Sequence, residues 1–214
     1  ATGEFVVWPT QALETYWCAH YDDATEWEPP YFDGAQNKSN CIVNDHPTVA
    51  ALHVLLRRAL QLPAAVGTDT QRAEWAALLK ILPPVPVIEE NGIVSVSPYS
   101  SYPINDKVFN SETPELYSVP PFRYFSLGRR DFGANSSRRD LTPALNCLTE
   151  GGKVRATCGN ANGNGGWNQG VMNAALLGNA EHAKAGLLGR SSSAPGAGYR
   201  FIGFAPHEQD YEPS

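Results

Sequence analysis

The chain has 214 residues, of which 42% are hydrophobic and 18% charged, and its net charge at pH 7 is −6. A chain of this length can bury a core of its own, and the composition excludes a coiled coil, a collagen and a disordered protein. Proteins that bind nucleic acid neutralise phosphates with Lys and Arg, so the acidic balance argues against nucleic acid as a partner. No apolar run approaches the roughly 20 residues that cross a membrane. We therefore expect neither nucleic acid nor a membrane as a partner.

Two helices are predicted in the first half of the chain. Residues 44–62 carry a cap at Asn44 or Asp45 and Pro47 in the first turn. Apolar residues follow at helical spacing, namely Val49, Leu52, Leu55, Leu56 and Leu60. The second helix starts with the capping box at residues 68–71 and stops before a run of prolines, which cannot continue a helix. The two helices are expected to form an αα-hairpin.

The rest of the chain alternates irregular segments with a second helical pair. Residues 87–126 are expected to be irregular or to form short extended segments. Residues 167–189 carry apolar side chains at helical spacing on both sides of Asn179, which predicts two helices with Asn179 as a cap between them. Residues 190–198 have linker composition and predict a mobile loop. About four helices result, so the predicted fold class is mainly α, in one domain over residues 1–214.

The cysteines and sequons indicate an oxidising compartment. The four cysteines form two couples along the chain, Cys18 with Cys41 and Cys147 with Cys158. Two disulfides are the preferred interpretation, and free buried thiols are the alternative. Zinc is disfavoured because neither closely spaced Cys pairs nor a matching His pair is present. Asn37 and Asn135 each begin a glycosylation sequon in a polar stretch. These features favour a secreted, extracellular glycoprotein.

Glu14 is a candidate general acid. It precedes Tyr16 and Trp17, and a carboxyl group held against aromatic faces loses water, which favours its protonated form. The alternative is a glutamate on the surface of a helix. Trp17 is a candidate substrate-binding residue beside it.

Two further places could contact a sugar. Near the end of the chain, His207, Glu208 and Asp210 belong to a run with three carboxylates and one histidine in six residues, which either binds sugar hydroxyls or is simply solvated. Trp167 follows a glycine-rich stretch and either stacks on a sugar ring or fills the core. That stretch lacks the Lys of a phosphate loop, and the last position of a calcium loop would be Val171, so no metal site is expected.

Four stretches together resemble one known family. They are residues 8–16 (WPTQALETY), 110–117 (NSETPELY), 166–169 (GWNQ) and 206–213 (PHEQDYEP). The set is similar to the six-hairpin glycosidase-like proteins, which are related to family 95 of the glycoside hydrolases, the α-L-fucosidases and α-L-galactosidases. The resemblance runs along essentially the whole chain. It implies an (α/α)6 toroid built of αα-hairpins with long irregular, partly extended loops, and hydrolysis of a glycan without a cofactor.

The resemblance also assigns roles to individual residues. Glu14 stands five residues after Pro9, as the general acid of family 95 does. Glu115 and Tyr117 match a stretch that lines the sugar pocket, with Glu115 in place of the family's histidine. Trp167 matches the Gly-Trp at the start of an inner helix. The family's water-activating partners have no counterpart here, although an inverting hydrolase needs two carboxyl functions on opposite sides of the bond.

A toroid of six hairpins needs twelve helices, whereas this sequence predicts about four. We therefore expect an internal piece of a larger domain, held to the remaining segments of the same toroid or to another chain. The expected function is hydrolysis of cell-wall or extracellular glycans, with the base outside this chain. Two alternatives stay open: a carbohydrate-binding protein without turnover, and a secreted structural or storage protein on the same scaffold.

Overall fold

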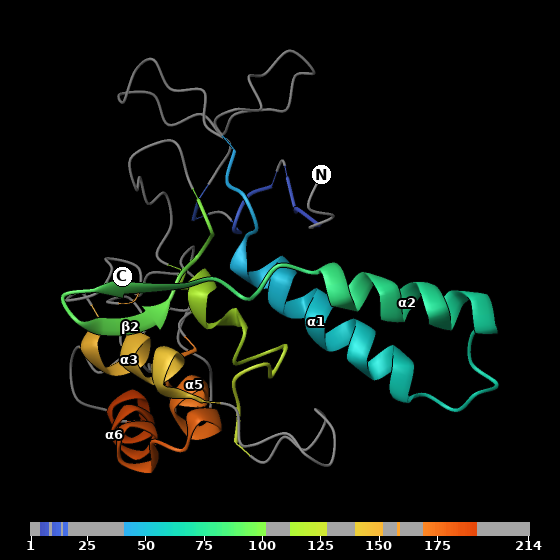
Figure 1. The fold of residues 1–214 in the computed structure, drawn as a ribbon. Helices are drawn as coiled ribbons and strands as arrows, with labels where there is room; N and C mark the ends of the chain where they lie inside the picture. The colour runs from blue at the N-terminus through green and yellow to red at the C-terminus, as the bar shows by residue number, and fades with distance from the viewer. Residues whose placement is uncertain are drawn as a thin grey trace, which may run out of the picture.

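The structure is a computed structural model of the chain. It describes residues 5–8, 10–13, 15–16, 41–101, 112–127, 140–151, 158 and 169–191. Within these residues the fold is mainly helical, as predicted, and one two-stranded sheet accompanies the helices. The elements in chain order (Figure 1) are α1 (His46–Gln61), α2 (Asp69–Ile81), β1 (Val87–Glu90), β2 (Ile93–Val96), the 3-10 helix η2 (Pro114–Tyr117), α3 (Thr142–Glu150), α5 (Gly170–Leu177) and α6 (Ala180–Ser191).

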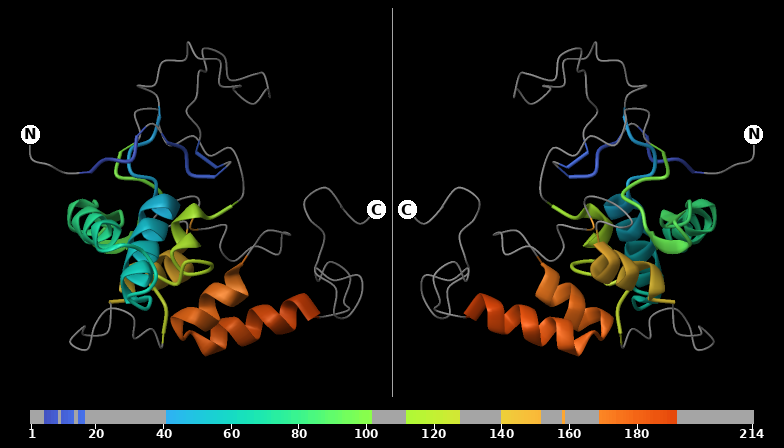
Figure 2. Two further views of the ribbon diagram at one scale, coloured as in Figure 1. Left: turned by 90° about the vertical axis from the view of Figure 1, so that its right-hand side faces the viewer. Right: turned by 90° about the vertical axis from the view of Figure 1, so that its left-hand side faces the viewer.

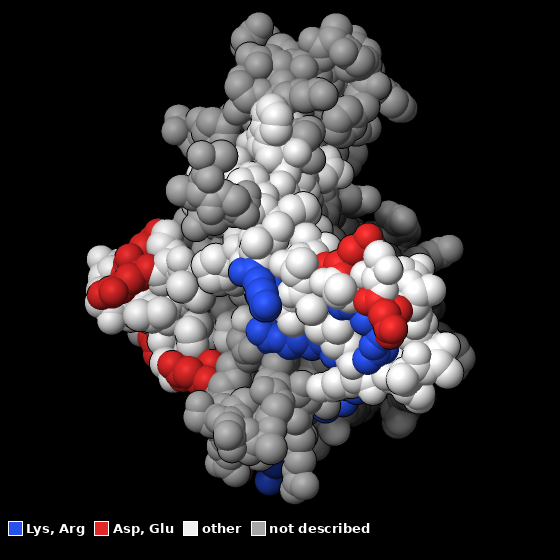
Figure 3. Space-filling model, turned by 45° about the vertical axis from the view of Figure 1, so that its right-hand side comes forward, with Lys and Arg blue, Asp and Glu red and all other residues white. Residues whose placement is uncertain are grey.

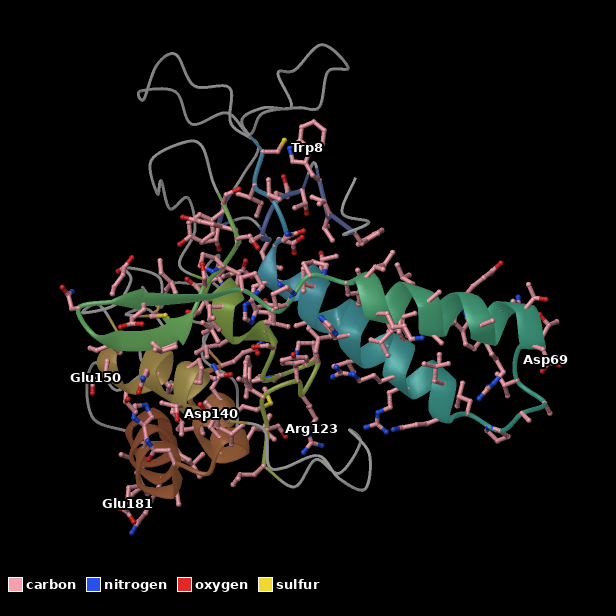
Figure 4. All side chains as sticks on the ribbon, in the orientation of Figure 1. Trp8, Asp69, Arg123, Asp140, Glu150 and Glu181 are labelled. Carbon is pink, nitrogen blue, oxygen red and sulfur yellow. A yellow bond between two sulfur atoms is a disulfide. The ribbon has the colours of Figure 1, made fainter. Side chains whose placement is uncertain are left out.

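The first predicted hairpin is confirmed: α1 and α2 pack against each other. The carboxylate of Asp45 caps α1 by accepting a hydrogen bond from the backbone N–H of Thr48 at 2.8 Å. At the start of α2, both hydrogen bonds of the capping box between Thr68 and Gln71 are present. No residue of α2 is fully buried, so this helix is held mainly by its caps and by α1. Figure 4 labels Asp69 at the far end of the hairpin.

A β-hairpin lies within residues 87–126, and its two four-residue strands agree with the short extended segments expected there. Strands β1 and β2 are antiparallel, with Val87 opposite Val96 and Glu90 opposite Ile93. The turn between them is Asn91-Gly92, and both residues have positive φ, 53° and 74°. An Asn-Gly pair with this backbone matches the twist of a two-residue hairpin. Strand β2 of this hairpin packs against α3.

Helix α3 was not predicted from the sequence. It begins at Thr142, whose backbone N–H donates to the carboxylate of Asp140 at 2.9 Å. Hydrogen bonds from the side chain of Thr142 and, to a smaller extent, from its backbone N–H lower the pKa of Asp140 below its ordinary value. The disulfide between Cys147 and Cys158 is confirmed and ties α3 to the chain that follows it. Cys41 is also disulfide-bonded, while Cys18 lies outside the described residues.

The second helical pair is confirmed with shifted bounds. Its first helix, α5, spans Gly170–Leu177 within the predicted range, and the two helices pack against each other. Asn179 caps α6 as predicted, because its side-chain oxygen accepts from the N–H of His182 at 3.1 Å. Helix α6 continues through Ser191, so the loop predicted for residues 190–198 cannot begin before that residue. The rest of that loop lies outside the described residues.

The main core lies where α1, β2, η2, α3 and α5 meet. Its buried members include Val49, Val96, Leu116, Leu148 and Leu177, one from each element. Figure 2 shows α2 and α6 on opposite sides of this core. A second, smaller cluster joins Ala12, Tyr16, Ile42 and Tyr99. Of the helices that the structure describes, none has the length and apolar character to cross a bilayer.

Candidate functional site

Two of the predicted sugar-site residues fall in the described part of the chain. They are Glu115 and Tyr117, both on η2. The other predicted site residues, and the two glycosylation positions, lie outside the described residues: Glu14, Trp17, Trp167, His207, Glu208, Asp210, Asn37 and Asn135. The site is therefore described through η2 and through the residues that flank Glu14.

Glu115 is a fully buried carboxylic acid in the short helix η2. Pro114 suits the first position of this helix because it has no N–H to satisfy. Its neighbour Leu116 enters the main core, and η2 packs against α1 and α3. The hydroxyl of Ser118 donates to the backbone oxygen of Glu115 at 3.2 Å. A buried carboxyl group is costly and is therefore uncommon away from functional sites and paired charges.

Tyr117 lies at the edge of the same helix and is half-buried. Its hydroxyl donates to Oε1 of Glu112 at 3.3 Å. Burial raises the pKa of Tyr117 to about 12, and the negative charge and the hydrogen bond of Glu112 add to this effect. The phenol therefore stays protonated at every physiological pH. Tyr117 can offer an aromatic face and a hydroxyl to a ligand, but it cannot act as a base.

The residues on both sides of Glu14 form a tight turn. Ala12 and Tyr16 exchange two backbone hydrogen bonds, of 3.0 and 3.2 Å, and Leu13 has a left-handed φ of 54°. Thr15 and Tyr16 are buried, and the ring of Tyr16 meets Tyr99 edge to face at a centroid distance of 5.2 Å. The structure does not describe Glu14 itself.

Hydrogen bonds attach this turn to the start of α1. The hydroxyl of Thr10 donates to Asp45 at 2.7 Å, so Asp45 serves both as the cap of α1 and as an anchor for the N-terminal segment. Asn44 adds a second anchor: its side-chain oxygen accepts from Val7 N–H at 2.8 Å, and its own N–H donates to Val7 O at 2.9 Å. The sequence indicated the capping role, but it carried no signal for the two long-range anchors.

Three buried polar side chains of the described residues were also not predicted. Oγ1 of Thr15, Oδ1 of Asn173 and both ring nitrogens of His46 have no hydrogen bond of normal geometry among the described residues. Burial lowers the pKa of His46 to about 4, and the backbone groups of Ser97 and Pro86 oppose this effect only weakly. His46 is thus neutral at physiological pH.

The two candidate segments are linked through the first turns of α1. Helix η2 packs on α1, and the turn at residues 12–16 is attached to the segment that leads into α1 (Figure 1). Where the chain is described, no three His, Cys, Asp or Glu side chains are grouped so that they could hold a metal ion.

Comparison of the chain with protein-family models, with curated proteins and with solved structures finds no match. The function is therefore argued from the residues and their geometry.

Proposed function

We propose that the chain is part of a secreted glycoside hydrolase that acts on cell-wall or extracellular glycans, with Glu14 as the general acid. The observation that supports this most is the tight turn between Ala12 and Tyr16, because its described residues are hydrogen-bonded and packed into an aromatic cluster. A general acid has to be held in a defined position beside the leaving group, and aromatic surroundings favour its protonated form.

The properties of Tyr117 on η2 are consistent with a sugar-binding role in this proposal. Tyr117 is half-buried and protonated, so it suits both stacking on a sugar ring and hydrogen bonding to a hydroxyl. Glu115 on the same helix is fully buried and does not meet solvent. In this proposal Trp17, Trp167, His207, Glu208 and Asp210 complete the pocket.

The two αα-hairpins, α1 with α2 and α5 with α6, are the repeating unit of the proposed (α/α)6 toroid. An inverting reaction requires an acid and a base about 6.5–9.5 Å apart, with a water molecule beside the base. Because Glu115 is fully buried, it is not positioned to activate water. We propose that the base comes from outside this chain, from the remaining segments of the toroid.

The test compares two leaving groups in the protein that carries this sequence. Glu14→Gln should slow hydrolysis of an alkyl glycoside by at least about 100-fold. It should slow hydrolysis of the nitrophenyl glycoside much less, because nitrophenolate leaves without protonation. The matched control is Glu181→Gln, which removes an exposed carboxylate from the first turn of α6 and should leave both rates unchanged.

Equal losses for both substrates, or equal effects of the two variants, would contradict the role of Glu14. If the unmodified protein binds sugars in calorimetry and releases no product from α-L-fucosides, α-L-galactosides or other glycosides, it is a carbohydrate-binding protein. If it neither binds nor hydrolyses any sugar, the structural or storage alternative replaces the proposal.

A further inference from the structure

Helix α1 has apolar side chains on two faces, of which only one belongs to the core. Val49 and Leu56 are buried, whereas Leu55, in the middle of the helix, is 63% exposed. The apolar residues that predicted one stripe in the sequence therefore divide into a core face and an outer face. An apolar helix face outside the core is a common interaction surface.

The outer face of α1 forms one wall of a groove with a volume of about 610 Å³. The opposite wall is the turn that follows η2. Most of the lining is apolar, and its central members are Ala51, Leu52, Leu55 and Phe122. The groove follows α1 for about three turns, which is the length over which a second helix can lie along it.

The charged residues that line the described groove are both arginines, Arg58 and Arg123, and no Asp or Glu lines it there. The chain as a whole has a net charge of −6, so the sign of the charge at the groove is opposite to that of the protein. Figure 3 shows Lys and Arg side chains gathered near the middle of one face, with Asp and Glu side chains on either side of them. Guanidinium groups at the rim of an apolar groove favour a partner with carboxylates next to its apolar face.

The backbone holds Arg123 in an unfavourable conformation. Its φ is 58°, in the left-handed region that residues with a side chain rarely adopt, and its N–H donates to Val119 O at 2.6 Å. Figure 4 shows Arg123 on the turn that follows η2. Such a conformation persists only where the surrounding structure enforces it, and it is enriched at binding sites.

We propose that this groove binds an amphipathic helix of a partner polypeptide, with the apolar face of that helix on Leu52, Leu55 and Phe122 and its flanking carboxylates on Arg58 and Arg123. The proposal does not rest on glycan hydrolysis: Glu115 and Tyr117, the two predicted sugar-site residues that the structure describes, do not line the groove.

The test uses two fluorescently labelled peptides of about four helical turns. Both carry leucines at helical spacing on one face; one has glutamates beside them and the other has lysines. Fluorescence anisotropy should show binding of the acidic peptide and at least tenfold weaker binding of the basic one. Leu55→Glu should weaken binding of the acidic peptide by at least tenfold. The matched control is Leu188→Glu on α6, because Leu188 is 61% exposed and lies outside the groove, and it should leave binding unchanged.

Reversing the charge of the two arginines distinguishes specific docking from nonspecific hydrophobic binding. Arg58→Glu combined with Arg123→Glu should exchange the preference, so that the basic peptide binds more tightly than the acidic one. Far-UV circular dichroism checks that each variant is folded. No binding of the acidic peptide, equal binding of the two peptides, or equal effects of Leu55→Glu and Leu188→Glu would overturn the proposal. A dimer in sedimentation that Leu55→Glu dissociates would also overturn it, since the groove would then hold a second copy of the chain.

Discussion

Acidification tests the burial of His46, because this histidine is neutral inside the fold and accepts a proton readily only when the chain unfolds. Its pKa is about 4 in the folded state, against an ordinary value of 6.5. Between these two values the unfolded chain binds more protons than the folded chain, so stability falls as the pH is lowered from 6.5 to 4. The loss attributable to His46 is about 3 kcal/mol, complete near pH 4 and absent above pH 7.

Urea unfolding between pH 7 and pH 4, followed by circular dichroism, measures this loss. Carboxyl groups titrate in part of the same range, so the informative quantity is the difference between the original chain and His46→Gln, which keeps a neutral polar side chain. Between pH 7 and pH 4, the free energy of unfolding of the original chain should fall by about 3 kcal/mol more than that of His46→Gln.

The matched control is His182→Gln, which removes a partly exposed histidine from α6. Its stability should follow that of the original chain over the whole pH range. If the curves for the original chain and His46→Gln run parallel, then His46 is hydrated or protonated in the folded state, and the reasoning from its burial fails.

Four further variants test the packing of two helices, a disulfide and a helix cap. Gly186→Ala places a methyl group 2.8 Å from a valine methyl of α5, whereas Gly189→Ala meets nothing within 4 Å. In thermal unfolding Gly189→Ala should raise stability by up to about 1 kcal/mol and Gly186→Ala should lower it; equal shifts would contradict the close approach of α5 and α6. Replacing Cys147 and Cys158 together with alanine should cost about 3 kcal/mol in urea unfolding, because their disulfide closes a loop with a sequence separation of 11, and an unchanged midpoint would refute this. Thr68→Ala should cost about 1 kcal/mol and should appear as faster amide exchange within α2; unchanged exchange would show that α2 does not depend on its cap.

The elements that were predicted correctly are those whose signals act over a few residues. The capping box of α2 joins Thr68 to Gln71, and Asn179 caps α6 through His182, only three residues away. The turn Asn91-Gly92 is a signal of the same kind, and its two positive φ angles show that a β-hairpin could have been predicted at this point. Asp140 and Thr142 mark the start of α3 in the same way.

Much less of the candidate site could be predicted from the sequence. The resemblance drew attention to Glu115 and Tyr117, but nothing in the residues indicated that Glu115 is fully buried or that Tyr117 donates to Glu112. His46 stands in the first turn of α1 with no pattern that marks it as buried. Its burial arises from tertiary packing, and the backbone groups of residues 86 and 97 that act on its pKa are about 40 to 50 positions away along the chain.

The sequence by itself determined the two helical hairpins and the caps of α1, α2 and α6, because a cap or an apolar repeat needs only neighbours within one or two turns. The tertiary structure decided which side chains lose contact with water. Leu55 and Leu56 are adjacent and equally apolar, yet Leu56 is buried in the core and Leu55 lines an open groove. Asp45 likewise caps its own helix by a local rule, but its hydrogen bond to Thr10, 35 residues away, exists only because folding brings the two segments together. Whether a residue is buried, and which distant residue it pairs with, depends on how segments far apart in the sequence pack together.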